Sequence, residues 1–225
     1  ETNGTSLGTG LQTVAGVGTQ MNIEWTASAD MLPEGAHFGI AFAPGAASGA
    51  TANDKGVGGD SAGVGSGYDI TVGSTGLADG LNVFGGMSRI EQPNGNSAGS
   101  STDGDRTQYV AGATYAVGSV TVGYQYSRDN TQSSGAAGTS YYENDAYGVS
   151  FAVNDDLTLS YGMHKSDRVL TNNSSVELEA SSLQLSYTMG GMSIKFAESQ
   201  VDNASYTSGT SADWDGRTIA LTLAF

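Results

Sequence analysis

The sequence contains no cysteine, only 3 prolines and no long apolar run. Without cysteine there is no disulfide, no thiolate nucleophile and no cysteine metal ligand. The two histidines, His37 and His164, are too few for a multi-histidine metal site, so we expect no metal and no cofactor. No stretch approaches about twenty apolar residues, which excludes a membrane-spanning helix.

Positive charge is also scarce. The 225 residues include 8 Lys and Arg against 23 Asp and Glu, for a net charge of −15. Such a chain would repel a nucleic-acid backbone, so we expect no nucleic-acid partner. The length suits one β domain. Because the first residue is Glu1 rather than methionine, we expect a mature, processed or partial chain.

The last twelve residues, Trp214 to Phe225, alternate strictly. Ile219, Leu221, Leu223 and Phe225 share one parity, and small or polar residues share the other. This period of two predicts a strand with one apolar face. Trp214 precedes Phe225 by about eleven residues, which at a tilt of about 40° spans roughly 25–28 Å, the height of the apolar band of a membrane β-barrel.

The same alternation recurs upstream, with short turns and long loops in strict succession. In outer-membrane barrels the short turns face the periplasm and the long loops face outside. A closed barrel with periplasmic ends needs an even number of strands, so either residues 1–20 supply one more strand or the chain is the C-terminal part of a larger barrel. The eleven strands that the alternation predicts are 21–30, 37–42, 68–72, 81–87, 109–115, 120–126, 147–153, 157–163, 183–189, 192–196 and 214–225.

The fold class that this pattern favours is an all-β, transmembrane, antiparallel up-and-down β-barrel. A soluble β-sandwich or solenoid also alternates. However, the inward parity is made of Ser, Thr, Gly, Ala, Gln and Asn, which is too polar for a protein core. The outward parity carries Tyr and Met where a soluble protein would meet water.

Four segments resemble general porins, in particular the alphaproteobacterial porin family. They are F-A-V-N-D-D-L-T-L-S-Y-G (151–162), L-S-Y-T-M-G-G-M-S-I-K-F-A (185–197), I-E-W-T-A-S-A-D (23–30) and the terminal L-T-L-A-F. The resemblance covers residues 21–225 as barrel strands. It implies a sixteen-stranded homotrimer in the outer membrane of a Gram-negative bacterium, forming a water-filled diffusion channel for small hydrophilic solutes and ions.

The chain is too short for sixteen strands, so the resemblance implies that five strands are missing upstream. Residues 1–20, by themselves a loop or a weak strand, then resemble the end of the loop that constricts the pore. The alternative is a complete twelve-stranded barrel, such as an autotransporter translocator or a specific-solute channel.

A diffusion pore needs no nucleophile; it needs lumenal charges that sort solutes. Each inward charge either does so or is simply a solvated wall residue. Outer-membrane phospholipases use a Ser/His pair that faces lipid, whereas both histidines here have inward parity, so we expect no enzyme. The pore-lining residues that parity predicts are Glu24, Asp30, His37, Asp69, His164 and Lys195.

Acidic residues concentrate toward the predicted outer loops. A negative vestibule would concentrate cations and give a weak cation preference, although solubility alone explains the same pattern. The fifteen carboxylates placed in these loops or their flanks are Asp54, Asp60, Glu91, Asp103, Asp105, Asp129, Glu143, Asp145, Asp167, Glu177, Glu179, Glu198, Asp202, Asp213 and Asp215.

Four basic residues form a predicted outward ring: Arg89, Arg128, Lys165 and Arg217. Each lies about eight residues, or roughly 20 Å of height, above the lowest outward residue of its strand. At that level a charge reaches the lipid phosphates, so we predict that the ring binds lipopolysaccharide through charge-assisted hydrogen bonds. Alternatively, the strands simply end there and any polar residue would serve.

Overall fold

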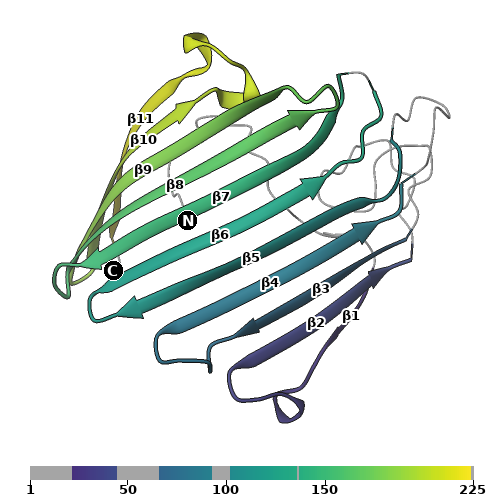
Figure 1. The fold of residues 1–225 in the computed structure, drawn as a ribbon. Helices are drawn as coiled ribbons and strands as arrows, with labels where there is room; N and C mark the ends of the chain where they lie inside the picture. Colours follow the sequence, from purple (N-terminus) through teal and green to yellow (C-terminus); the bar gives the residue numbers. More distant parts are fainter. Residues whose placement is uncertain (1–21, 45–65, 93–101, 136, 224–225) are drawn as a thin grey trace.

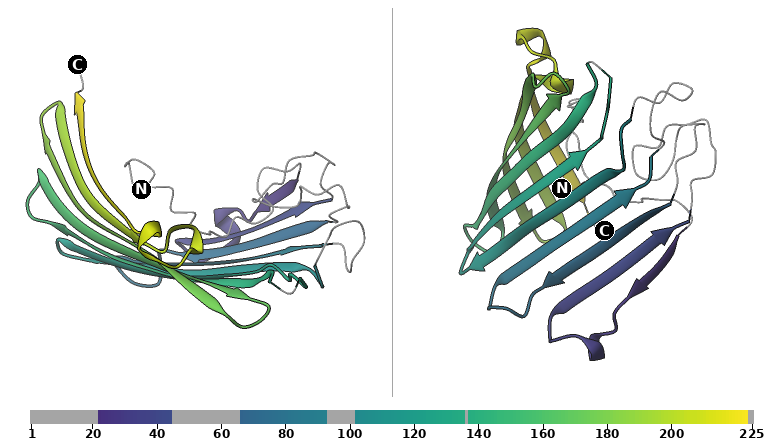
Figure 2. Two further views of the ribbon diagram at one scale, coloured as in Figure 1. Left: turned by 90° about the horizontal axis from the view of Figure 1, so that it is seen from above. Right: turned by 45° about the vertical axis from the view of Figure 1, so that its right-hand side comes forward.

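A single antiparallel sheet contains all eleven strands of the computed structural model, which describes residues 22–44, 66–92, 102–135 and 137–223. The strands pair strictly in chain order, so each is hydrogen-bonded to its neighbours in sequence. Figure 1 shows the tilted strands side by side, and the view from above in Figure 2 shows the sheet curved into an open trough. The predicted all-β, up-and-down architecture and its eleven strands are confirmed.

The longest strands lie on the C-terminal side of the middle strand, where β7 and β8 each have 14 residues and β9 has 15. In the part of the chain that the structure describes, no helix is long and apolar enough to cross a membrane. The elements are β1 (Ile23–Thr26), η1 (Ala29–Met31), β2 (Ala36–Ala43), β3 (Gly67–Ser74), β4 (Leu81–Ile90), β5 (Arg106–Val117), β6 (Val120–Asn130), β7 (Thr139–Ala152), β8 (Leu157–Leu170), β9 (Ser175–Met189), β10 (Met192–Asp202), η2 (Ala204–Tyr206), η3 (Thr210–Ala212) and β11 (Trp214–Leu223).

One face of the sheet carries an exposed apolar band. Trp25 lies opposite Ile40, and Tyr161 lies opposite both Val149 and Leu183. All five side chains are exposed. Because side chains that face each other across antiparallel strands point to the same side, the outward parities predicted for separate strands combine into one continuous surface.

The opposite face is the concave one. Leu178, Ser166 and Asn144 lie opposite one another across β9, β8 and β7 and are all buried. Tyr206 in η2 packs against Leu178, and Figure 2 shows η2 on the concave side of the trough. The polar parity therefore lines the inside of the curve and the apolar parity the outside.

Local chemistry explains the short turns. Gly118 and Gly190 adopt positive φ values of 58° and 57°, which glycine reaches at little steric cost. In the β7–β8 turn, Oδ1 of Asn154 accepts hydrogen bonds from the backbone N–H groups of Asp156 and Leu157, both at 2.9 Å. This Asx-type turn closes the hairpin where the sequence predicts it.

The predicted strand 21–30 is wrong at its C-terminal end. β1 ends at Thr26, and the chain enters the η1 turn, where the N–H of Met31 donates to the carbonyl of Ser28 at 3.0 Å. Pro33, which has no N–H to give to a ladder, follows directly. Asp30 therefore lies in the turn rather than on a strand, and the parity that placed it in the lumen does not apply.

Two other expectations also change. Trp214 lies opposite Val201, on the concave face, so it does not mark the upper edge of the apolar band. The strand predicted over 147–153 begins earlier, because β7 already starts at Thr139. Glu143 and Asp145 are thus strand residues. The expectations for residues 1–20 and for Asp54, Asp60 and Phe225 lie outside the described residues.

The two faces predict opposite chemical accessibility for neighbouring residues of β9. Ser182 has concave parity and Leu183 convex parity. In lipid membranes, Ser182→Cys should react with a charged, water-soluble thiol reagent, whereas Leu183→Cys should be protected by lipid. Because the chain has no cysteine of its own, mass spectrometry reads each site without background. Equal labelling of both variants would contradict the assignment of the faces.

Candidate functional site

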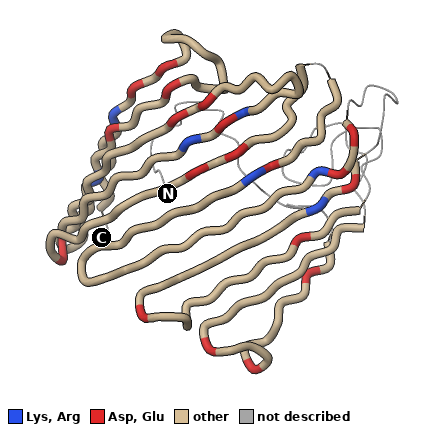
Figure 3. The backbone as a smooth tube through the Cα atoms, viewed as in Figure 1, with Lys and Arg blue, Asp and Glu red and all other residues tan. Residues whose placement is uncertain are grey.

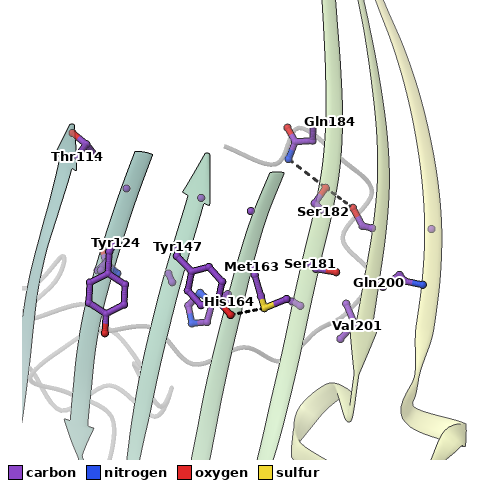
Figure 4. A pocket seen from close by; sticks show the side chains of 18 of the residues that line it. Thr114, Tyr124, Tyr147, Met163, His164, Ser181, Ser182, Gln184, Gln200 and Val201 are labelled. Atoms are coloured by element: carbon purple, nitrogen blue, oxygen red, sulfur yellow. Dashed lines mark hydrogen bonds between the residues drawn. The ribbon is translucent and has the colours of Figure 1, made fainter. Parts of the chain in front are cut away.

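A row of very small residues crosses the concave face from β5 to β11. Its seven members lie opposite one another in an unbroken register, and none of them has a side chain larger than that of threonine. They are Thr114, Gly123, Gly148, Gly162, Ser182, Ser199 and Gly216. A hollow of about 720 Å³ is bounded by this row (Figure 4). A surface with such small side chains suits a water-filled lumen rather than a packed core.

Neutral hydrogen-bonding groups border the hollow. Gln184 donates through Nε2 to Oγ of Ser182 at 3.3 Å, and Ser182 and Ser199 share a hydrogen bond of 2.9 Å (Figure 4). His164 also lines the hollow, and its buried Nε2 has no hydrogen-bond partner among the described residues. Within the described ranges, no group of three or more His, Asp and Glu side chains could hold a metal ion.

The charged residues predicted to line the pore have concave parity wherever they lie on strands. Glu24 and Asp69 share one register row, because both lie opposite Ala41. The structure does not bring the set together as one site: among the described residues, no ion pair joins any two of them. The five strand residues are Glu24 on β1, His37 on β2, Asp69 on β3, His164 on β8 and Lys195 on β10.

A buried ion pair on the concave face was not predicted. Arg106 donates from Nε and Nη2 to the two carboxylate oxygens of Asp129, at 2.8 and 2.5 Å, and the Asp129 side chain is 0% exposed. Asp129 was expected in an outer loop or its flank. Because β6 continues to Asn130, Asp129 instead lies on the strand, with concave parity. Extending the strand parities by a few residues would have placed both partners on one face.

Each basic residue of the predicted outward ring has convex parity, and each is already held by a neighbour. Three of them form cross-strand ion pairs: Arg89 with Asp105 at 2.6 Å, Lys165 with Glu179 at 2.7 Å, and Arg217 with Glu198 at 2.8 Å. Arg128 instead donates to Oδ1 of Asn130 at 3.0 Å and lies 3.8 Å above the Tyr141 ring. Such exposed pairs are individually weak.

Relative to the register of the sheet, the ring residues step down the strands from β4 to β11. The register row of Arg89 meets β6 two residues above Arg128, and the row of Arg128 meets β8 two residues above Lys165. The row of Lys165 meets β10 four residues above the partner of Arg217. For the four residues to lie at one level, an offset of eight residues over seven strand spacings, at about 3.3 Å per residue and about 4.8 Å per spacing, requires a strand tilt of about 38°.

This tilt falls within the range of roughly 35–45° found in outer-membrane barrels. A boundary that is level in space must step down the strands in this way when the strands are tilted. Figure 3 shows charged residues along the halves of β6–β9 that lie nearer the β6–β7 and β8–β9 connections, and long uncharged stretches along the other halves. The lower limit of the charged zone thus behaves as a planar boundary across the convex face.

The chain matches no model of a known protein family and no curated protein. Its fold is similar to solved outer-membrane proteins. Salmonella typhi OmpF, in complex with daunomycin, aligns with a TM-score of 0.64 at 14% identity, over 89% of this chain and 61% of that one. A refined porin structure aligns with a TM-score of 0.58 at 17% identity, over 90% and 60%.

OmpT, an outer membrane protein of Vibrio cholerae, aligns with a TM-score of 0.53 at 15% identity, over 80% of this chain and 53% of that one. The chain therefore spans between about half and three fifths of the length of these structures. At such identities the likeness establishes the fold: this sheet has the architecture of outer-membrane porin barrels. The narrower resemblance to the alphaproteobacterial family stays a prediction.

Proposed function

We propose that the protein is an outer-membrane porin of a Gram-negative bacterium, a water-filled channel for passive diffusion of small hydrophilic solutes and ions. The observation that carries the proposal is the division of one porin-like sheet into two faces. A convex apolar band ends at a level charged boundary, and the concave face keeps a hollow beside a row of glycine, serine and threonine. The convex apolar band suits contact with lipid, and the hollow of the concave face suits water.

A complete twelve-stranded translocator is not favoured, because the similar structures include porins. We further propose a homotrimer whose other partners are outer-membrane lipids and lipopolysaccharide. An enzymatic role of the phospholipase type is not proposed. That chemistry needs a histidine facing lipid, and both His37 and His164 share the concave parity.

The channel proposal predicts stepwise conductance. The full-length protein, purified from outer membranes and added to planar lipid bilayers, should insert as discrete current steps. A hydrated lumen conducts ions without a binding or gating ligand. Heat-denatured protein at the same concentration is the control. Electrically silent insertion of folded protein would overturn the proposal and favour a barrel for another task.

A weak preference for cations is a second prediction. In a KCl gradient the reversal potential should favour K⁺, and less so at high salt because salt screens exposed charges. Glu24→Gln removes an exposed carboxylate from the concave face and should reduce the preference. Asp215→Asn is the matched control: the sequence placed Asp215 among the vestibule carboxylates, but on β11 it has the convex parity of Arg217 and faces away from the lumen. A Cl⁻ preference in the unaltered channel would contradict the prediction.

The basic ring is proposed to contact lipopolysaccharide. Replacing Arg89, Arg128, Lys165 and Arg217 together by Gln should lower the melting temperature more in lipopolysaccharide-containing membranes than in detergent. The lost ion pairs weaken the barrel in both media, so the difference between the media isolates the lipid contact. Replacing Asp105, Glu177, Glu179 and Glu198 by Gln or Asn removes the same ion pairs and serves as the control. Equal losses would support the simpler view that the strands end at this level.

A further inference from the structure

The segment between β10 and β11, residues 203–213, rises beyond the ends of the strands, and its η2 turn lies on the concave side of the sheet (Figure 2). Ala204, Tyr206 and Ala212 are buried, which is unusual for a connection at the open end of a trough. Tyr206 packs against Leu178 and Val201, with Tyr142, Val176 and Ala180 around them. This is the one cluster of its kind among the described residues, and it joins the segment to the wall.

A buried chain of hydrogen bonds fastens the end of the Tyr206 side chain. Its hydroxyl shares a hydrogen bond of 2.6 Å with Oγ of Ser166. Ser166 donates to Oδ1 of Asn144 at 2.5 Å, and Nδ2 of Asn144 donates to Oγ of Ser127 at 3.2 Å. Because Ser166 uses its proton for Asn144, the proton between Tyr206 and Ser166 belongs to the tyrosine.

The backbone of the segment needs these contacts. Asn203, Ser205 and Tyr206 have φ values of 55°, 56° and 55°, in the left-handed region that non-glycine residues disfavour. Asn203 is anchored separately, because its Nδ2 donates to the carbonyl of Glu177 at 2.8 Å and its N–H donates to Asp213 at 3.1 Å. A conformation of this kind persists only where its surroundings hold it.

Tyr206 also covers a cation. Nη2 of Arg168 donates to the Tyr206 carbonyl at 3.3 Å, and its guanidinium carbon lies 5.4 Å from the centre of the Tyr206 ring. Nε of Arg168 is buried and has no hydrogen-bond partner, and none of the ion pairs of the described residues includes Arg168. Removing the tyrosine would therefore expose more of this guanidinium on the concave side.

We propose that residues 203–213 form a fixed shelf that narrows the outer mouth of the channel, and that Tyr206 determines both solute size limit and ion preference there. From β10 the shelf reaches over β9 to Ser166 on β8, about 10 Å of wall at normal strand spacing. By covering Arg168 it keeps the mouth from attracting anions. The inference rests on the proposed channel function and adds a selectivity element to it.

The test uses the full-length protein in planar bilayers. Tyr206→Ala should raise single-channel conductance and shift the reversal potential toward Cl⁻. Tyr206→Phe, which keeps the ring and loses the hydroxyl, should give a smaller change in both. Tyr161→Ala is the matched control, because Tyr161 belongs to the convex apolar band, and it should leave both quantities unchanged. Adding Arg168→Gln to Tyr206→Ala should abolish the Cl⁻ shift and keep the higher conductance.

A second measurement leaves Tyr206 in place. Ser205→Cys puts a thiol on the exposed side of the shelf, and a bulky thiol reagent there should lower conductance, whereas Ser174→Cys in the β8–β9 turn should not respond. The shelf proposal is wrong if folded Tyr206→Ala conducts as the unaltered channel does. It is also wrong if the Ser205→Cys variant carries the same current before and after labelling. Electrically silent insertion of the unaltered protein would instead contradict the channel proposal itself.

Discussion

The continuous antiparallel register is the constraint on which everything else in this sheet depends. Each strand alternates between an apolar and a polar side, and cross-strand pairing joins eleven separate alternations into two surfaces. The pairing admits no slip of one residue, since that would carry Lys165 to the concave face and His164 to the apolar band. The cost of turning the polar face toward lipid and the apolar face toward water gives this register its specificity.

The number of strands, their order and the side of the sheet to which each residue points could be predicted, because they follow from local signals. Alternation marks the apolar part of each strand, and Asn154 and Gly118 mark turns whose chemistry is local. The upper ends of β7–β9 could not be predicted in the same way. Above the apolar band both parities are polar, as with Glu143 and Asn144, so the period of two disappears although the hydrogen-bonded ladder continues.

The same distinction applies to the candidate site: the face on which each residue lies could be predicted, but its partners could not. Parity alone assigns His37, His164 and Lys195 to the concave face. It says nothing about partners, because the meeting of Arg106 with Asp129 depends on the register between β5 and β6. Tyr206 was out of reach for a further reason: it belongs to an irregular connection, and its burial depends on contacts with β7, β8 and β9 that no periodicity encodes.

The attachment of Tyr206 to Ser166 has a mechanical consequence as well. Strands that are joined only by ladders of hydrogen bonds can slide along one another when a sheet is sheared. A cross-brace that starts beyond β10, passes over β9 and ends on β8 resists such sliding, because it would have to stretch. The last hairpin of the chain is in this way joined to the one before it by a contact outside the ladder of backbone hydrogen bonds.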